Sequence, residues 1–539
     1  MTSTLQSFIA GRWTGQSAAM ALRSAVNGQV VAHTHADELD FGQAVLHARR
    51  VGLPGLLARD FQQRAATLRA LAKFLNEHKE ALYSVSAHTG ATRADSWIDI
   101  EGGTGTLLAY AGVGANELPS GNVLHEGPAL SLGKTGAFAG THILVPRGGV
   151  AVHINAFNFP VWGMLEKFAP CFLAAMPCIV KPASATSYLT EAALRLIVQS
   201  GLLPAGALQL VIGGTGDLLD HLNGQDMVTF TGSADTAAKL RVQANLVRHS
   251  IPFNAEADSL NCAILGADVS PDDEAFELFI KEVAREMTVK AGQKCTAIRR
   301  AIVPRQHLEA VAERLGARLA KVVVGDPALD GVRMGALASQ AQLADVRERV
   351  AQLRSAGAEL AWSAGDGFAP LGQGSELGAF MSPTLLLCQL PFDAAAVHDI
   401  EAFGPVSTLM PYDAGSSGMD EAIALASLGR GSLVATLVTQ DARTAARVVP
   451  QLAALHGRIL VLDPEAAAES TGHGSPLPML KHGGPGRAGG GEELGGIRAV
   501  THHLQRAAVQ GSPSMLAAVT GEHVRGAKVT ESEVHPFRR

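Results

Sequence analysis

Hydrophobic residues recur every three or four positions near residues 60–90, where Leu68, Leu71, Phe74 and Leu75 are separated by charged and polar side chains. This spacing places the apolar side chains on one face and predicts a helical stretch. A second helix is predicted over residues 272–290, because Pro271 and several acidic residues stand at its start.

Short continuous apolar runs predict buried strands. Four such runs occupy residues 150–154, 178–181, 208–213 and 227–231. Helical segments separate them, for example residues 189–200 and 236–247. Strands that alternate with helices predict an α/β fold in which a parallel sheet carries helices on both faces. Ligands of such folds bind at the carboxyl ends of the strands.

The pattern starts afresh after Glu256. A strand is predicted at residues 297–303, and a second α/β unit extends from there to about residue 430. Residues 141–145 and 497–504 are strand-like segments outside both units. Residues 472–496 are very rich in glycine, and a flexible surface loop is one interpretation of that stretch.

Length and composition narrow the class of protein. A chain of 539 residues is too long for one hydrophobic core, and a hydrophobic content of 47% excludes a disordered protein. A net charge of −6 with no basic stripe argues against nucleic-acid binding. The most apolar stretch, residues 168–180, contains two prolines and is too short to cross a membrane, so we interpret it as core.

Five irregularly spaced cysteines do not form a disulfide framework, and no CxxC pair suggests a metal site. The first residues lack the basic and apolar regions of a signal peptide. These features predict a cytoplasmic protein without a metal centre.

One cysteine stands in a distinctive context. Cys295 lies in the run Gly292-Gln293-Lys294-Cys295-Thr296, where the neighbouring lysine or a helix end could lower its pKa. A lone cysteine is most often a small buried hydrophobe. Here, however, three further runs occur in a characteristic order: Phe157-Asn158-Phe159-Pro160, Lys181-Pro182-Ala183-Ser184 and Glu401-Ala402-Phe403-Gly404-Pro405.

Together with Glu256, these runs resemble the aldehyde dehydrogenase superfamily, and the resemblance extends from Ile9 to about Gln505. It implies a Rossmann-like NADP-binding domain (residues 1–128 and 148–256) and an α/β catalytic thiol domain (257–494). It also implies a small β oligomerisation arm with a C-terminal tail (129–147 and 495–539), and therefore a homodimer or a dimer of dimers.

The resemblance assigns the catalytic roles. Cys295 is the nucleophile, Asn158 donates to the oxyanion, and Glu256 is the general base that activates water. Asp258 is a rival base, and Asn158 could instead only cap a turn before Pro160. The family run Glu-Leu-Gly-Gly-Lys is replaced here by Glu-Ala-Asp-Ser-Leu-Asn, which keeps the glutamate but loses the glycines.

The cofactor residues implied by the resemblance are Lys181, Ser184, Gly232, Ser233, Glu401 and Phe403. In the family, residues at the positions of Lys181 and Ser184 contact the ribose. Gly232 and Ser233 stand at the start of a helix whose N–H groups bind phosphate. Residues at the positions of Glu401 and Phe403 contact the nicotinamide end. Relatives that prefer NAD typically carry glutamate at the Ser184 position. Serine removes that negative charge, so we predict NADP with weaker use of NAD.

The glycine-rich runs near residues 472–496 resemble the branch of the family that oxidises semialdehydes attached to coenzyme A during aromatic degradation, as in aerobic benzoate breakdown. Some members carry a hydratase after the dehydrogenase, and we expect no room for one here. Arg487 is a candidate contact for the CoA phosphates, although a structural role in a turn is favoured.

Four alternatives remain. They are the semialdehyde of phenylacetate degradation, a general aliphatic aldehyde, a CoA-acylating reaction, and a non-catalytic NADP-binding protein on the same fold.

Overall fold

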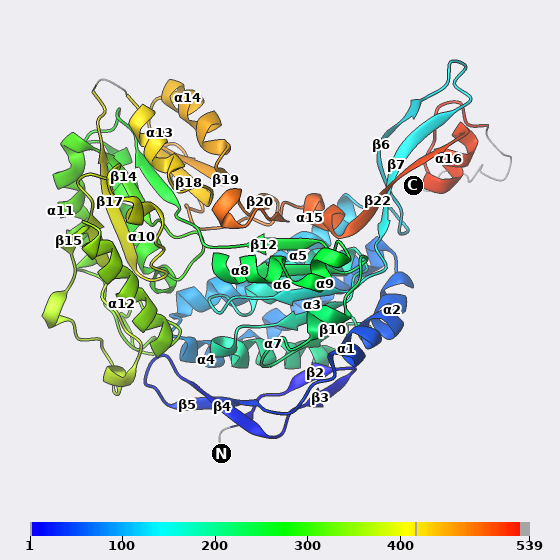
Figure 1. Ribbon diagram of the computed structural model, residues 1–539, viewed down its shortest axis with the longest axis horizontal. Coiled ribbons are helices and arrows are strands. Elements are labelled where there is room, and N and C mark those ends of the chain that lie inside the picture. Colours follow the sequence, from blue (N-terminus) through cyan, green and yellow to red (C-terminus); the bar gives the residue numbers. More distant parts are fainter. Residues whose placement is uncertain (1–2, 416–417, 529–539) are drawn as a thin grey trace.

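A computed structural model describes residues 3–415 and 418–528 of the chain. Residues 1–2, which begin the expected NADP-binding domain, residues 416–417 of the expected catalytic domain, and residues 529–539, which end the expected C-terminal tail, lie outside the described residues. Two seven-stranded sheets form the two large lobes, and a three-stranded sheet projects from them (Figure 1).

The first large sheet has the strand order β12-β11-β8-β9-β10-β2-β3. Its first five strands are parallel, and β2 and β3 add an antiparallel edge. The strands are β2 (Ser7–Ile9), β3 (Arg12–Thr14), β8 (Ala151–Ile154), β9 (Cys178–Lys181), β10 (Leu208–Leu210), β11 (Met227–Thr231) and β12 (Phe253–Glu256). The four predicted strands are confirmed.

Alternate residues of these strands enter two different cores, because successive side chains of a strand point to opposite faces. In β9, Cys178 and Val180 face one core and Ile179 faces the other. Helices fill both faces: α1 (Phe41–His47), α2 (Leu53–Leu57), α3 (Phe61–Glu77), α4 (Lys79–Ser86), α5 (Arg93–Asn116), α6 (Trp162–Leu173), α7 (Ser187–Ser200), α8 (Ala234–Arg241) and α9 (Ala244–Arg248). The helix expected over residues 236–247 is thus two helices.

The second large sheet has the order β15-β16-β17-β14-β13-β18-β19 and is parallel except for β15. Its strands are β13 (Cys262–Leu265), β14 (Arg300–Pro304), β15 (Glu359–Trp362), β16 (Thr384–Leu387), β17 (Val406–Tyr412), β18 (Ser432–Val438) and β19 (His456–Leu462). The predicted second α/β unit is present, but it is larger than the expected residues 297 to about 430, because β13 precedes that range and β18 and β19 follow it.

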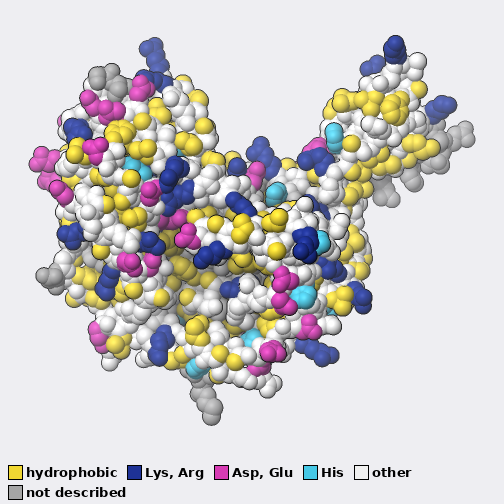
Figure 2. Space-filling model, in the orientation of Figure 1, with side chains coloured by type: hydrophobic (Ala, Val, Ile, Leu, Met, Phe, Trp, Pro, Cys, Tyr) yellow, Lys and Arg dark blue, Asp and Glu magenta, His cyan; other side chains and the backbone are white. Residues whose placement is uncertain are grey.

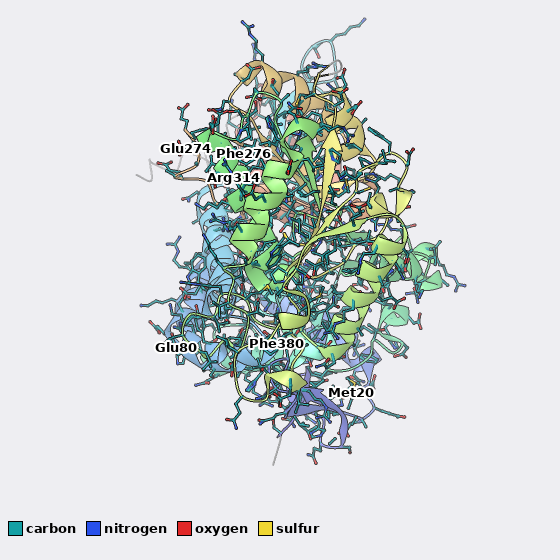
Figure 3. The ribbon with its side chains drawn as sticks, turned by 90° about the vertical axis from the view of Figure 1, so that its left-hand side faces the viewer. Met20, Glu80, Glu274, Phe276, Arg314 and Phe380 are labelled. Carbon is teal, nitrogen blue, oxygen red and sulfur yellow. The ribbon has the colours of Figure 1, made fainter. Side chains whose placement is uncertain are left out.

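Five helices cover the second sheet: α10 (Glu274–Thr288), α11 (Leu308–Leu319), α12 (Gln340–Ser355), α13 (Asp420–Ser427) and α14 (Ala442–Ala453). Figure 3 shows Phe276 of α10 beside Arg314 of α11, whose guanidinium carbon lies 4.9 Å from the ring centroid. This packing joins the two helices on the outer side of the lobe.

The projecting sheet consists of β6 (Leu124–Ser131), β7 (Ala139–Pro146) and β22 (Leu504–Gly511), and α16 (Pro513–Thr520) packs on it. The strand expected at residues 497–504 is wrong, because α15 (Ile497–His502) occupies most of it. Ile497, Val500 and Leu504 have helical spacing. All three pack in the core that contains Cys178 and Val180 of β9, which we call the first core.

Two small sheets complete the fold. One contains β1 (Ser3–Thr4), β4 (Ala18–Arg23) and β5 (Val30–His35), and the other contains β20 (Lys481–His482) and β21 (Glu493–Leu494). The glycine-rich stretch is therefore partly ordered as a β-ribbon. No helix among the described residues is long and apolar enough to cross a membrane.

Candidate active site

A cavity of about 950 Å³ lies where the two large lobes meet α5 and α6. Asn158, Glu256 and Cys295 all line it, as do Trp162 and Lys167 of α6. The three residues that the sequence proposes for catalysis, 137 positions apart at most, thus line the same cavity.

A tight turn presents Cys295. After α10 ends, Lys290 and Ala291 adopt left-handed backbone angles with φ of 55° and 50°. Gly292 follows with φ of 67°, and a Cβ there would collide with the carbonyl of Gly404. Glycine is therefore required at this position. The contact packs the Cys295 run against the Glu401 run.

Asn261 holds the Cys295 backbone. Its side-chain amide donates to the carbonyl of Cys295 at 2.7 Å and to that of Ala297 at 3.1 Å. Its oxygen accepts from the Ser259 hydroxyl at 2.6 Å and from the backbone of Val434. The segment that departs from the family pattern thus supports the nucleophile, a role that sequence reasoning missed.

Glu256 ends β12 and is fully buried beside the thiol. His482 Nε2 lies 3.1 Å from Oε1 of Glu256 and 3.9 Å from Sγ of Cys295. Burial opposes ionisation of this carboxyl, but His482 and Lys167 outweigh it and hold the pKa of Glu256 below its usual range. Sequence reasoning did not identify His482; a histidine inside an otherwise small-residue stretch was the available signal.

Asp258, the rival base, is used elsewhere. Its carboxylate accepts from the backbone N–H of Ala234 at the start of α8 and from Arg487. It does not line the cavity. The geometry therefore favours Glu256 over Asp258 as the carboxylate next to the thiol.

Asn158 lies buried in the wall of the cavity. One amide N–H donates to the carbonyl of Gln293 at 3.1 Å, which fixes the side chain next to the Cys295 run. A side-chain amide has two N–H donors, so the second can serve an oxygen in the cavity.

The lysine before the nucleophile does not act on it, contrary to one expectation. Lys294 Nζ pairs with Glu286 Oε1 at 2.7 Å, and both groups are buried. Burial, together with the carboxylates of Glu256, Glu166 and Glu401, raises the pKa of the Cys295 thiol in this resting arrangement. Activation therefore needs a proton acceptor.

The proposed cofactor residues follow neighbouring parallel strands. Ile154 of β8 is in register with Lys181 of β9, and the N–H of Asn155 donates to the Lys181 carbonyl at 3.0 Å. Ser184 begins a short 3₁₀ helix (Ser184–Thr186) just beyond. Burial lowers the pKa of Lys181. These side chains lie at the edge where α/β sheets bind ligands.

Gly232 and Ser233 follow β11. Thr231 is in register with Glu256, and Ser233 caps α8 through the N–H of Thr236. Within the described residues, the amide atoms of buried Asn155 and the buried Oγ1 atom of half-buried Thr231 find no protein hydrogen-bond partner. Both residues line the cavity, so this edge has donors and acceptors to offer a polar cofactor.

Glu401 and Phe403 are joined to the thiol loop by Arg299. The guanidinium lies 3.5 Å from Oε1 of Glu401, donates to the carbonyls of Gly292 and Gly404, and stands over the Phe403 ring. Burial raises the pKa of Glu401 to about 7, although Arg299 opposes the shift. Neither Glu401 nor Phe403 lines the cavity itself. Arg299 is a further residue that sequence reasoning missed.

The glycine-rich stretch is part of the site. Residues 474–478 and His482 line the cavity, and the Gly474 carbonyl accepts from the Thr296 hydroxyl at 3.0 Å. A freely moving surface loop is therefore the wrong interpretation. Arg487 contacts Asp258 and the backbone carbonyls of His398 and Asp399, which confirms the structural role favoured for it.

Comparison with known proteins agrees with this geometry. The aldehyde dehydrogenase family model matches residues 13–505. The chain is 42% identical over 483 residues to 3,4-dehydroadipyl-CoA semialdehyde dehydrogenase of Aromatoleum evansii, covering 89% of this chain and 93% of that protein. It is 53% identical over 206 residues to Protein MaoC of Klebsiella aerogenes, covering 38% and 58% of the two chains.

Solved structures show the same fold. Betaine aldehyde dehydrogenase from Staphylococcus aureus, solved with NAD+, superimposes with a TM-score of 0.80 at 22% identity over 94% of both chains. The aldehyde dehydrogenase of Bacillus cereus gives 0.79 at 21% identity, covering 94% of this chain and 96% of that one. The predicted fold is confirmed, and with a family match that spans the thiol, the amide and the carboxylate, this chain belongs to the aldehyde dehydrogenase family.

Proposed function

We propose that this protein oxidises a semialdehyde attached to coenzyme A to the carboxylic acid, with NADP as the electron acceptor. The observation that carries the proposal is that Cys295, Glu256 and Asn158 line one cavity. The 42% identity to an enzyme named for 3,4-dehydroadipyl-CoA semialdehyde supports that substrate and a place in aerobic benzoate degradation.

The chain's own residues divide the work. Cys295 loses its proton and attacks the carbonyl carbon, which forms a thiohemiacetal whose oxygen carries negative charge. The free N–H of Asn158 and the backbone N–H of Cys295 stabilise that oxygen, an interaction worth about 3 kcal/mol for one donor. After oxidation to the thioester, Glu256 takes a proton from water, which attacks and releases the acid.

Bound NADP supplies the hydride acceptor. Lys181 and Ser184 would hold its ribose and 2′-phosphate, Gly232 and Ser233 its diphosphate, and Glu401 and Phe403 its nicotinamide end. The absence of a carboxylate at Ser184 leaves nothing there to repel the 2′-phosphate, and a hydroxyl can donate to it.

The cavity supports an aldehyde at the end of a longer molecule. Most of its lining surface is apolar, and Gly102, Gly105 and Ala109 contribute small residues along α5, so an aliphatic chain fits. Trp97 lines it too and is 56% exposed, which places an aromatic surface where the cavity meets solvent. The polar CoA portion would remain outside.

We also propose the domain roles that follow from this function. In this proposal residues 1–128 and 148–256 form the NADP-binding domain, residues 257–494 the catalytic thiol domain, and residues 129–147 and 495–539 the oligomerisation arm and C-terminal tail. The projecting sheet, its β6–β7 connection and α16 expose large apolar side chains, namely Leu130, Leu132, Phe138, Met515 and Val519. Figure 2 shows hydrophobic side chains gathered on this projecting part, at the upper right. Such a surface fits a contact with another copy in a homodimer or a dimer of dimers.

The test compares substrates and cofactors directly. NADPH formation is followed with a six-carbon CoA-linked semialdehyde and with the free aldehyde of the same length, each with NADP and with NAD. A kcat/KM at least tenfold higher for the CoA-linked aldehyde with NADP is expected. Equal or higher values for the free aldehyde would reduce the function to a general aldehyde dehydrogenase, and no turnover with either would refute it.

A further inference from the structure

Three of the five cysteines lie beside a buried histidine. The distances from Sγ to Nε2 are 3.3 Å for Cys171 and His153, 3.7 Å for Cys262 and His456, and 3.9 Å for Cys295 and His482. Among these three histidines, His482 is the one whose Nε2 also meets a carboxylate, at 3.1 Å from Glu256. It is also the one that lines the cavity.

The ring of His456 shows what a merely structural pair looks like. Its Nδ1 lies 2.9 Å from the Leu452 carbonyl and must donate to it, which leaves Nε2 as an acceptor for the Cys262 thiol. Burial lowers the pKa of His456 to about 4, so the ring is neutral. This thiol keeps its proton and remains inert.

His482 carries the opposite proton arrangement. A nitrogen 3.1 Å from a carboxylate oxygen needs a hydrogen between the two atoms, so Nε2 is a donor toward Glu256. Burial works against a charged ring, but Glu256 outweighs it and raises the pKa of His482. The Sγ of Cys295 lies beside the same N–H.

Other charges around the cluster are accounted for. The other charged side chains near the thiol are Glu166 and Lys167 of α6, Glu493 of β21, and Glu401, which lies in the loop before β17. Lys167 pairs with Glu166 at 2.9 Å and with Glu493 at 3.1 Å, and Glu401 pairs with Arg299. Among the described residues, His482 is therefore the imidazole that contacts both the sulfur and the carboxylate.

We propose that His482 is a further catalytic residue. Its Nε2 keeps its hydrogen during turnover and donates a hydrogen bond first to the carboxylate of Glu256 and then to the sulfur of Cys295. This inference rests on the proposed function. It gives the imidazole contact with a reacting atom, which neither Lys167 nor Arg299 has.

The proton balance is simple. The sulfur and the carboxylate lie within 4.8 Å of one another, so Glu256 can take the thiol proton directly or through one water. The S–H bond breaks, an O–H bond forms, and the negative charge moves from carboxylate to sulfur. The Nε2–H then follows the charge, because a neutral carboxylic acid is the weaker acceptor.

The second half of the cycle reverses this movement. Attack on the aldehyde moves the negative charge from sulfur to the former carbonyl oxygen, and Glu256 releases the proton that it took from the thiol to solvent. The Nε2–H then bonds to the carboxylate again, which orients Glu256 for activation of the hydrolytic water. One donor thus serves the nucleophile first and the base afterwards.

The test reads the thiol without any aldehyde. The full-length protein is alkylated with iodoacetamide between pH 5 and 10, and modification of the Cys295 peptide is followed by mass spectrometry. His482→Ala is expected to raise the apparent pKa of Cys295 by one unit or more and to slow alkylation at neutral pH at least tenfold. His482→Gln replaces the imidazole with an amide that can still donate an N–H, and it should give an intermediate rate.

His456→Gln is the matched control, because it removes a buried histidine that lies beside a different thiol, that of Cys262, outside the cavity. Its Cys295 profile should coincide with that of the native protein. Coincident profiles for native protein and His482→Ala would overturn the proposal. If His482→Ala does not fold, judged by its thermal melt, an unchanged profile in His482→Gln overturns it instead.

The two proposals fail separately. Aldehyde oxidation by the native protein with unchanged alkylation in the His482 variants would refute the role of His482 and leave the proposed function. Altered alkylation in a protein that oxidises no aldehyde would support the contact and refute the function.

Discussion

The side-chain amide of Asn261 donates a 2.7 Å hydrogen bond to the carbonyl of Cys295, so the nucleophile's backbone is held by a residue 34 positions earlier. The same side chain bonds Ala297, Ser259 and Val434, and all of these atoms are buried or nearly so. Position 261 therefore joins β13, β18 and the thiol loop.

Asn261→Ala should destabilise the fold and loosen the loop. It leaves several buried donors and acceptors unpaired, at a cost of about 2–4 kcal/mol. The measurements are the thermal midpoint and kcat, both expected to fall. Asn261→Asp keeps the acceptor but loses the amide donors, so its kcat should fall while the bonds to Ser259 and Val434 persist. A native thermal midpoint in Asn261→Ala would contradict this account.

Cys295→Ala should abolish turnover and retain NADP binding, because the thiol forms the covalent bond but belongs to no part of the proposed cofactor edge. A loss of at least a thousandfold in kcat is expected, with unchanged cofactor affinity by fluorescence quenching. Cys388→Ala is the control, since that thiol lies away from the cavity. Substantial activity without Cys295 would rule it out as the nucleophile.

Glu256→Gln should leave a burst of NADPH and a stalled acyl-enzyme, because the amide cannot take a proton from the hydrolytic water. Rapid mixing measures the burst, and intact-protein mass spectrometry measures the acyl adduct. Asp258→Asn should keep steady-state hydrolysis, as Asp258 serves α8 and Arg487. The reverse pattern would make Asp258 the base.

Ser184→Glu should weaken NADP relative to NAD by at least tenfold in kcat/KM. The new carboxylate repels the 2′-phosphate, while its oxygens can accept from ribose hydroxyls. Ser184→Ala, which adds no charge, should change the ratio far less. An unchanged ratio in Ser184→Glu would show that the 2′-phosphate is read elsewhere.

Asp99 makes stability depend on pH. Burial raises its pKa to about 6, although Lys290 and the N–H groups of Val161 and Trp162 oppose the shift. Between the ordinary value of 3.8 and about 6, the unfolded chain loses this proton while the folded protein keeps it. The stability contributed by Asp99 therefore falls by about 3 kcal/mol as pH rises through that window and is constant above it.

Asp99→Asn keeps the acceptor oxygen but cannot ionise. Its stability relative to the native protein should therefore increase between pH 4 and pH 7, measured as the difference in denaturation midpoint at each pH. A constant difference would mean that Asp99 titrates normally.

The sequence by itself determined many of the elements and the principal chemical groups. Apolar runs at β8, β9 and β11 and helical spacing in α3 follow from local side-chain pattern, which acts over neighbouring positions. Motif order was sufficient to indicate Cys295, Glu256 and Asn158. Residues 497–504 show the limit of local pattern, since the same apolar residues fit a helix once they meet the first core.

Only the tertiary structure decided what surrounds the thiol. His482 lies 187 positions from Cys295 in the sequence and yet contacts its sulfur. Lys294 is adjacent to Cys295 in the sequence, but its side chain pairs with Glu286 instead. Asn261, Arg299 and the glycine-rich stretch gain their roles from contacts between distant segments. The charge state of a buried thiol depends on which groups lie within a few ångströms, and that is set by packing of the whole chain rather than by adjacency along it.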